Sequence, residues 1–180
     1  MSRYELVKEQ MKREVMEIRE VLQEEMLIFY ELMGEVEYSL FNLENEKHIE
    51  WLKRRIDKLY YNGAKFFGGF NEAGNPLGLI TILIDEFPEG INEGCNSCEV
   101  IEMGVINGRR DKGYGSELLK HIEEYAKEKN VYCMYMHTYA GDYDVIAFYG
   151  KNGYVPVGML PDVYGPKNEG MLYMRKIIGN

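Results

Sequence analysis

The segment RRDKGYGSELLK, residues 109–120, places two glycines directly before a predicted amphipathic helix. The first turn of a helix leaves backbone N–H groups unpaired at the positive end of the helix dipole, where a phosphate or diphosphate can bind. Gly113 and Gly115 carry no Cβ that would hold such a ligand away, and glycine tolerates unusual φ. The alternative is that Gly113 only turns the chain and Gly115 only packs the helix against the sheet.

The charges around these glycines fit an anionic ligand, but two common phosphate-binding motifs do not fit the segment. Arg110 and Lys112 add positive charge, and Ser116 adds a hydroxyl donor. The dinucleotide-binding fingerprint needs a third glycine where Leu118 stands, and no acidic residue follows on a strand at the required distance. A Walker loop needs Gly-Lys followed by Ser or Thr, which the sequence lacks.

The composition indicates one packed domain in a chain of 180 residues, 46% of them hydrophobic and 28% charged. The formal net charge of −9 disfavours nucleic acid as a partner, because nucleic-acid binding needs clustered cations. No run of eighteen apolar residues occurs and the charged N-terminus has no apolar signal core, so we expect neither a membrane span nor a signal peptide.

The cysteines and histidines do not predict a metal site. The three cysteines, an odd number, indicate reduced thiols and a cytoplasmic protein. Cys95 and Cys98 have the spacing of half a zinc site, but such a site needs further ligands and the three histidines are scattered singly. We therefore expect loop thiols, with a zinc or redox role as the alternative.

Hydrophobic periodicity predicts the secondary structure. Apolar residues at helical spacing predict a long helix from Met11 to about Met33, while residues 3–8 fit either a short strand or the first turns of that helix. Further helices are predicted at 46–61, 114–129 and 145–151, and strands at 65–70, 77–84, 99–106, 131–139, 154–160 and 171–178. The order indicates a mixed α/β domain of the α+β type, with helices packed against one sheet.

Three motifs in the same order resemble those of the GNAT superfamily of acyl-CoA-dependent N-acyltransferases. Arg110-x-x-Gly113-x-Gly115 resembles its R/Q-x-x-G-x-G/A loop. Phe148-Tyr149-x-x-x-Gly153-Tyr154 resembles its FY-x-x-x-GF segment, and the terminal MRKII resembles its closing M-x-K-x-L strand. The resemblance covers about residues 65–178.

The resemblance implies the GNAT fold, a central mixed and mostly antiparallel sheet flanked by helices, with two parallel strands splayed apart at a coenzyme A cleft. Residues 1–180 would form a single domain, with a helical acceptor side at 1–63 and an acyl-CoA-binding core at 64–180. The opening strand of the family is not apparent in the sequence. Glycine within a strand often marks a bulge, and the resemblance places at Gly104 the bulge that splays the strands. The alternative is close packing at Gly104.

The resemblance also implies the residues that hold acetyl-CoA. Main-chain groups of Met103 and Val105 would bind the pantetheine arm, with the Val105 N–H facing the thioester oxygen. The loop and helix start would bind the diphosphate through Arg110, Asp111, Lys112, Gly113, Tyr114, Gly115 and Ser116. The family's frequent asparagine ahead of the short helix is Asp142 here, which we expect to point away from the cofactor or to cap the helix.

Tyr149 falls where the family places the general acid that protonates the leaving sulfur. The alternative interpretation is that the Tyr149 ring only packs against other residues of the core. Glu99 and Glu102 are the candidate general bases, since Glu99 falls where histone-acetyltransferase-like members carry theirs. Residues three apart on a regular strand face opposite sides, so only one of the two should reach the cleft without help from a bulge. Water chains, His137 and Tyr139 are further candidates.

The predicted function is that of an N-acetyltransferase, which moves an acetyl group from acetyl-CoA to a primary amine by direct attack in a ternary complex. The acceptor would be an amine-bearing small molecule or a peptide, and no metal, nucleic acid or membrane is expected to take part. The alternative is a coenzyme A-binding sensor without turnover. The long N-terminal helix could also serve as the arm of a homodimer.

Overall fold

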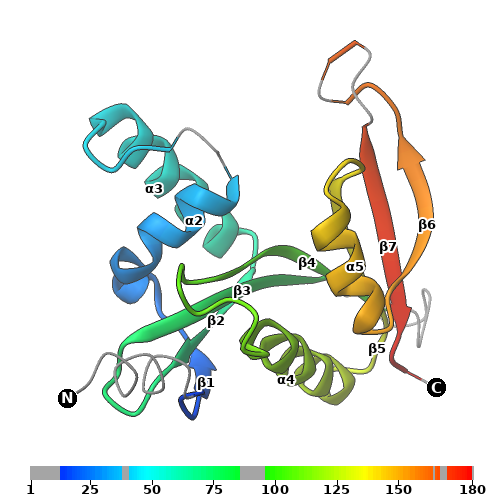
Figure 1. Ribbon diagram of the computed structural model, residues 1–180, viewed down its shortest axis with the longest axis horizontal. Coiled ribbons are helices and arrows are strands. Elements are labelled where there is room, and N and C mark those ends of the chain that lie inside the picture. The colour runs from blue at the N-terminus through cyan, green and yellow to red at the C-terminus, as the bar shows by residue number, and fades with distance from the viewer. Residues whose placement is uncertain (1–12, 38–40, 86–95, 164, 167–169, 180) are drawn as a thin grey trace, which may run out of the picture.

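The computed structural model describes residues 13–37, 41–85, 96–163, 165–166 and 170–179. Within these residues, seven strands form one sheet in the order β1-β2-β3-β4-β5-β7-β6 (Figure 1). Only β4 and β5 are parallel neighbours, as predicted. The strands are β1 (Glu17–Glu20), β2 (Lys65–Phe70), β3 (Pro76–Asp85), β4 (Asn96–Val105), β5 (Val131–Tyr139), β6 (Val155–Leu160) and β7 (Met171–Ile177).

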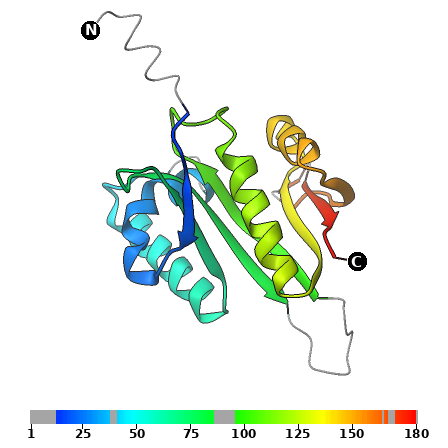
Figure 2. The ribbon, with the colours of Figure 1, turned by 90° about the horizontal axis from the view of Figure 1, so that it is seen from below.

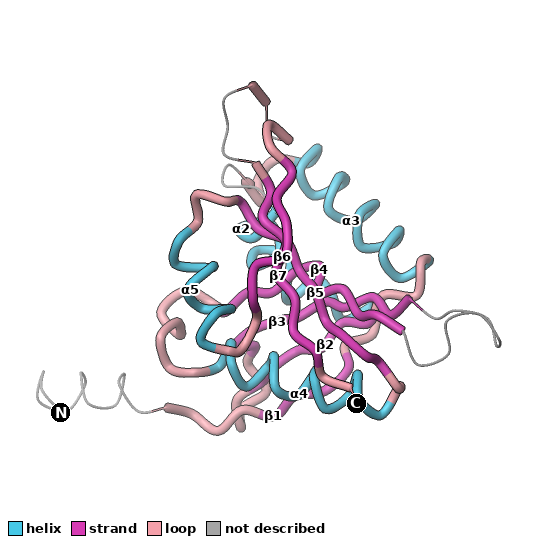
Figure 3. Tube along the Cα trace, turned by 90° about the vertical axis from the view of Figure 1, so that its right-hand side faces the viewer, coloured by secondary structure: helices cyan, strands magenta, loops and turns pink. Residues whose placement is uncertain are grey.

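Helices cover both faces of the sheet (Figures 2 and 3). They bury two separate cores. They are the 3₁₀-helix η1 (Gln23–Phe29), α2 (Tyr30–Glu37), α3 (Glu46–Tyr61), α4 (Tyr114–Glu128) and α5 (Tyr143–Lys151). One core joins α4 and α5 to the sheet, around Leu118, Ile122 and Tyr149. The other joins η1, α2 and α3 to the opposite face, around Phe29, Leu52 and Phe66. Among the described residues, no helix is long and apolar enough to cross a membrane.

The prediction of one helix over residues 11–33 is wrong for the part that the structure describes. Residues 17–20 form edge strand β1, paired antiparallel with β2, so the opening strand is present. The N-terminal part is therefore not purely helical, and the proposed dimerisation arm loses its long helix. Residues 1–12, which include the predicted element at 3–8, lie outside the described residues.

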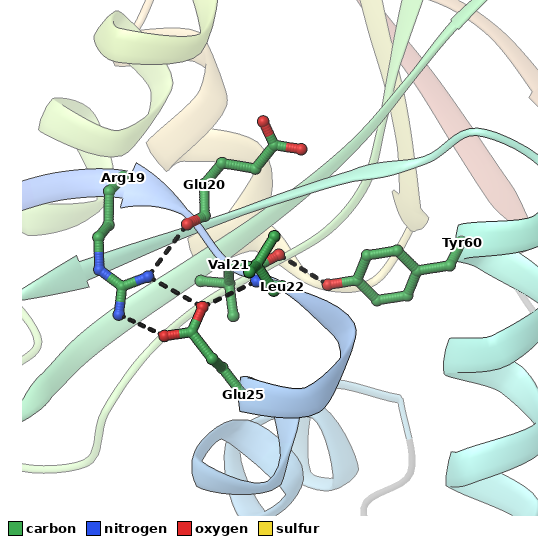
Figure 4. Close-up of polar contacts among 6 residues, drawn as sticks. All are labelled: Arg19, Glu20, Val21, Leu22, Glu25 and Tyr60. Carbon is green, nitrogen blue, oxygen red and sulfur yellow. Dashed lines mark hydrogen bonds and ion pairs between the residues drawn. The ribbon is translucent and has the colours of Figure 1, made fainter.

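Figure 4 shows the junction that separates β1 from η1. Leu22 is extended, with ψ 157°, and its N–H donates to the Glu25 carboxylate at 2.9 Å. Arg19 holds the same carboxylate through bonds of 3.0 and 2.7 Å and, with this N–H, lowers its pKa. The Tyr60 hydroxyl donates to the Val21 carbonyl at 2.8 Å, which ties the junction to α3. These contacts fix a break where the periodicity alone fits a continuous helix.

The other predicted elements are confirmed with small changes at their ends. The helix at 46–61 and the strand at 131–139 have the predicted bounds. Asn45 caps α3 by accepting from the Lys47 N–H at 3.0 Å. Strand β4 begins three residues earlier than predicted, and α5 begins two residues earlier. Local patterning is therefore sufficient for the part of the chain that resembles the GNAT motifs.

The bulge in β4 lies at Ile101, and its predicted position at Gly104 is wrong. Ile82 pairs with Val100 and Thr81 with Glu102, so Ile101 is the extra residue. Gly104 pairs regularly with Leu79 and approaches α2 closely. A Cβ at Gly104 would lie 2.8 Å from Val36 Cγ2 and 2.9 Å from Leu32 Cδ1. Gly104 is therefore required for close packing, which was the alternative interpretation.

Gly104→Val is expected to destabilise the fold by about 1–3 kcal/mol, because it overfills the contact between β4 and α2. Urea unfolding would measure the free energy of unfolding. Gly158→Val is the matched control, since nothing lies within 4 Å of a Cβ at this glycine of β6. Equal stability of the two variants would contradict the close packing.

Candidate active site in the cleft between β4 and β5

A cleft of about 1350 Å³ opens where β4 and β5 separate. The last pair between these strands is Val100 with Met136, whereas β4 stays paired with β3 as far as Val105 and β5 stays paired with β7 as far as Tyr139. The walls come from the ends of both strands, the loop that leads into α4, the first turn of α4, α5 and Glu35 of α2. The predicted splaying of the parallel strands is confirmed.

The first turn of α4 faces the cleft with its backbone N–H groups. Gly113 is the N-cap residue at φ +84°, a conformation that favours glycine, and it has no side chain to cap the helix. The Glu117 N–H is the first to bond within the helix, to the Gly113 carbonyl at 3.1 Å. A Cβ at Gly115 would lie 3.1 Å from Phe148 Cζ. Gly113 therefore shapes the turn that begins α4, and Gly115 lets α4 approach α5.

The structure brings the predicted cofactor residues together with one exception. Met103, Val105, Arg110, Asp111 and the segment 113–116 all line the cleft, whereas Lys112 does not. The Tyr114 side chain is buried, and its hydroxyl accepts from the Glu14 N–H at 2.8 Å, so only its backbone is available to a ligand. Arg110 donates from Nε to the Val105 carbonyl at 3.3 Å, which fixes the loop against the end of β4.

The backbone of β4 also presents donors to the cleft. The Ile106 N–H donates to the Leu77 carbonyl of β3 at 3.0 Å. Alternate residues of a strand direct their backbone groups to opposite sides, so the N–H groups of Val105 and Met103 point away from β3. They face the space that β5 has left, where an extended amide-bearing ligand could pair with them.

Tyr149 lies on α5, lines the cleft and is only 4% exposed. Its ring contacts Phe148 and Tyr154 edge-on, with centroids 5.2 and 5.4 Å away. Burial raises the pKa of the Tyr149 hydroxyl above its ordinary value. The group is therefore protonated at neutral pH, as a proton donor must be.

The bulge at Ile101 places both candidate bases on one face of the sheet. Glu99 pairs with Leu83 and Glu102 pairs with Thr81, on the face covered by α2 and α3. Glu102 is 5% exposed and lines the cleft, and its Oε1 lies 2.9 Å from Arg55 Nε and 2.7 Å from Nη2. Glu99 does not line the cleft. The bulge therefore puts Glu102 on the same face as Glu99, which a regular strand would not do. Of the two, only Glu102 lines the cleft.

Nothing in the described part of the chain forms a group of three or more His, Cys, Asp or Glu residues suited to a metal ion. The expectation of a loop thiol is wrong for Cys98, which is buried in strand β4, and burial raises the pKa of its thiol to about 12. Its predicted partner Cys95 lies outside the described residues. Asp142 accepts from the Val145 N–H at 3.2 Å and so caps α5, as expected.

Comparison with known proteins agrees with this geometry. The model of the acetyltransferase (GNAT) family matches residues 19–154. The chain belongs to the GNAT acetyltransferase family. YdhI, an uncharacterized protein of Bacillus subtilis (strain 168), is 31% identical over 96 residues, which span 53% of this chain and 53% of YdhI. The chain thus aligns with about half the length of this relative.

Solved GNAT structures share the fold. A variant of the spermidine N-acetyltransferase SpeG from Vibrio cholerae has a TM-score of 0.68 at 18% identity, with 91% of this chain and 94% of the other covered. A ribosomal-protein-alanine N-acetyltransferase from Brucella melitensis has a TM-score of 0.63 at 22% identity, with 89% and 99% covered. At these low sequence identities, the similarity shows a shared fold and does not show a shared substrate.

Two sets of site contacts were not predicted from the sequence. Arg13 forms an ion pair with Glu117, and its guanidinium lies 3.8 Å from the position of a Cβ at Gly113. Glu14 forms an ion pair with Arg109. A charged segment ahead of β1 therefore packs beside the turn that begins α4. No local pattern indicates this, because about a hundred residues separate the partners in the chain.

Arg55→Ala should destabilise the protein by about 2–3 kcal/mol, because it leaves the Glu102 carboxylate buried without its cation, and Arg55 itself is partly exposed. The double variant Arg55→Met/Glu102→Leu should recover most of this loss in chemical denaturation. Lys120→Ala, which breaks an exposed pair with Glu124, is the control and should change stability by less than about 0.5 kcal/mol. Additive single-variant effects would show that Arg55 and Glu102 do not depend on each other.

Proposed function

We propose that the protein is an N-acetyltransferase that transfers the acetyl group of acetyl-CoA directly to a primary amine in a ternary complex. The observation that carries this proposal is the placement of three groups on one cleft: the open first turn of α4, the edge of β4 that β5 leaves, and the buried Tyr149. Their chemistry matches the diphosphate, the pantetheine amides and the thioester sulfur of the acyl donor.

Each end of the acyl donor has a complementary surface. The N–H groups at residues 114–116, together with Arg110, Asp111 and Ser116 of the same wall, surround the place for the diphosphate. The Lys112 side chain lies outside the cleft lining and would act through its charge alone. Main-chain groups of Met103 and Val105 would pair with the pantetheine arm, as an added strand pairs with a sheet edge.

The reaction needs a hydrogen-bond donor to the developing oxyanion, a general acid and a general base. The Val105 N–H would donate to the thioester oxygen as negative charge develops on it. The Tyr149 hydroxyl would give its proton to the sulfur as the C–S bond breaks. Of the two predicted bases, Glu102 lines the cleft and is paired with Arg55, whereas Glu99 does not line the cleft.

An amine acceptor is supported by the kinds of reaction named for structural neighbours, spermidine acetylation and acetylation of a ribosomal-protein alanine. We propose an amine-bearing small molecule or peptide that reaches the thioester from the face with α2 and α3. Cytoplasmic location, a homodimer and the absence of a metal from the reaction remain predictions. The alternative, a coenzyme A sensor, differs in one measurable property, since it would bind acetyl-CoA without transferring the acetyl group to any amine.

Gly113→Glu should abolish coenzyme A binding measured by calorimetry, because its carboxylate would occupy the place of the diphosphate. Gly63→Glu is the matched control. Gly63 has the same left-handed conformation, at φ +85°, ends α3 away from the cleft, and has nothing within 4 Å of a Cβ. The control should lose stability but bind coenzyme A normally. Unchanged affinity in Gly113→Glu would place the cofactor elsewhere.

Tyr149→Phe should lower kcat about 100-fold, the usual contribution of a general acid, and leave the Kd for acetyl-CoA within about twofold. Single-turnover acetyl transfer to a panel of polyamines, aminoglycosides and lysine peptides would measure the chemical step. Tyr154→Phe, which removes the neighbouring buried hydroxyl on the same side of the sheet, is the control and should retain its rate. An unaltered rate in Tyr149→Phe would remove this residue from the mechanism.

A further inference from the structure

His137 and Glu99 face each other across the point where β4 and β5 part. Glu99 immediately precedes Val100, and His137 immediately follows Met136, the two residues of the last pair between the strands. His137 Nε2 lies 3.6 Å from Glu99 Oε1, within ion-pair range. The Tyr135 hydroxyl lies 3.5 Å from the other oxygen of Glu99. Glu99 therefore lies between His137 and Tyr135, within reach of both.

Only His137 of these three lines the cleft. Its side chain is 34% exposed and that of Glu99 is 25% exposed, so both retain contact with water. The ring of Tyr173 on β7 supports the imidazole from the other side, with centroids 5.6 Å apart. Nε2 faces Glu99, which leaves Nδ1 to accept a proton from a group in the cleft.

We propose that His137 is the general base of the acetyl transfer and that Glu99 positions its ring and stabilises its protonated form. This inference rests on the proposed function. The amine nitrogen forms the bond to the thioester carbon and gives its proton to Nδ1 of His137. The C–S bond breaks, the sulfur takes a proton from Tyr149, and the protonated imidazole later returns its proton to Tyr149 through solvent.

The two faces of the sheet separate the acid from the base. Met136 packs in the same core as Tyr149, on the face with α4 and α5. The next residue, His137, points to the opposite face by strand alternation, and there it meets Glu99. The gap left by the splayed strands is the place where a thioester could touch both groups. An amine would then enter from the face with α2 and α3 while the leaving sulfur stays on the face with Tyr149.

Among the described residues, titratable side chains of three strands lie near His137 and Glu99. Glu99 from β4, Tyr135 from β5 and Tyr173 from β7 approach the imidazole or its partner. Glu102, on the same wall of the cleft, is held by Arg55 of α3. Burial, followed by the charge of Glu99, raises the pKa of Tyr135, so this hydroxyl is a neutral hydrogen-bond donor to the carboxylate.

His137→Ala tests the base directly and is expected to lower kcat with an amine acceptor about 100-fold, with acetyl-CoA affinity within about twofold of the wild type. Added imidazole should restore at least about tenfold of the lost rate, because it can occupy the space of the missing ring. His121→Ala, a histidine of α4 outside the cleft, is the control and should show neither effect. His137→Gln provides a second variant of similar size if the alanine variant folds poorly.

Glu99→Gln tests the positioning role. It should lower kcat about fivefold to tenfold with KM for the amine unchanged, because the imidazole ring loses the carboxylate that orients it. Tyr135→Phe, which removes the hydroxyl near the other oxygen of Glu99, should lower kcat by less than Glu99→Gln does.

The outcomes separate the two proposals. Full activity of His137→Ala, with chemistry limiting the rate, would overturn the base assignment and leave the acetyltransferase proposal intact. A loss of activity together with acetyl-CoA affinity, and without imidazole rescue in either His137 variant, would show a structural role and also overturn it. Wild-type protein that binds acetyl-CoA but acetylates no amine would refute the proposed function, and the base role with it.

Discussion

The separation of β4 from β5 beyond Val100 and Met136 is the constraint on which the rest of the site depends. Each strand keeps its other neighbour, since β4 remains bonded to β3 and β5 remains bonded to β7. The sheet therefore stays intact while two of its inner edges lose their partners. Buried backbone groups need hydrogen bonds, and an extended ligand lying along these edges could supply them. The fold thus creates a binding edge within the sheet itself.

The two helices beside this gap fix the distance between its functional parts. Gly115 of α4 lies against Phe148 of α5, and a Cβ at Gly115 would lie only 3.1 Å from Phe148 Cζ, a tight contact. The same contact therefore sets the position of the first turn of α4 relative to Tyr149, which neighbours Phe148. Arg110 adds a second restraint by binding the Val105 carbonyl, which ties the loop to the end of β4. The site is consequently held by packing on one wall and by a hydrogen bond on the other.

Elements determined by local sequence patterns were predicted correctly. Elements determined by contacts with residues far away in the chain were not. Helix 46–61 has an Asn cap and a clear apolar stripe, and its bounds were predicted correctly. Strand β1 is four residues long at a sheet edge, and only its pairing with β2 distinguishes it from a helix of similar periodicity. The bulge at Ile101 is equally nonlocal, because it exists only as a register shift against β3. Motifs identified the cleft residues, but the partner of each carboxylate required the structure.

The position of the bulge explains why two glutamates three residues apart have different surroundings on the same face. In a regular strand Glu102 would share the face of Val100 and enter the apolar core beneath α4, where an unpaired carboxylate is costly. The extra residue at Ile101 turns Glu102 to the opposite face, where Arg55 of α3 neutralises it. The same turn curves β4 away from β5 immediately after Val100. One inserted residue therefore both opens the cleft and places the charge of Glu102 in its wall, and Glu99, still within the paired region, is left facing His137.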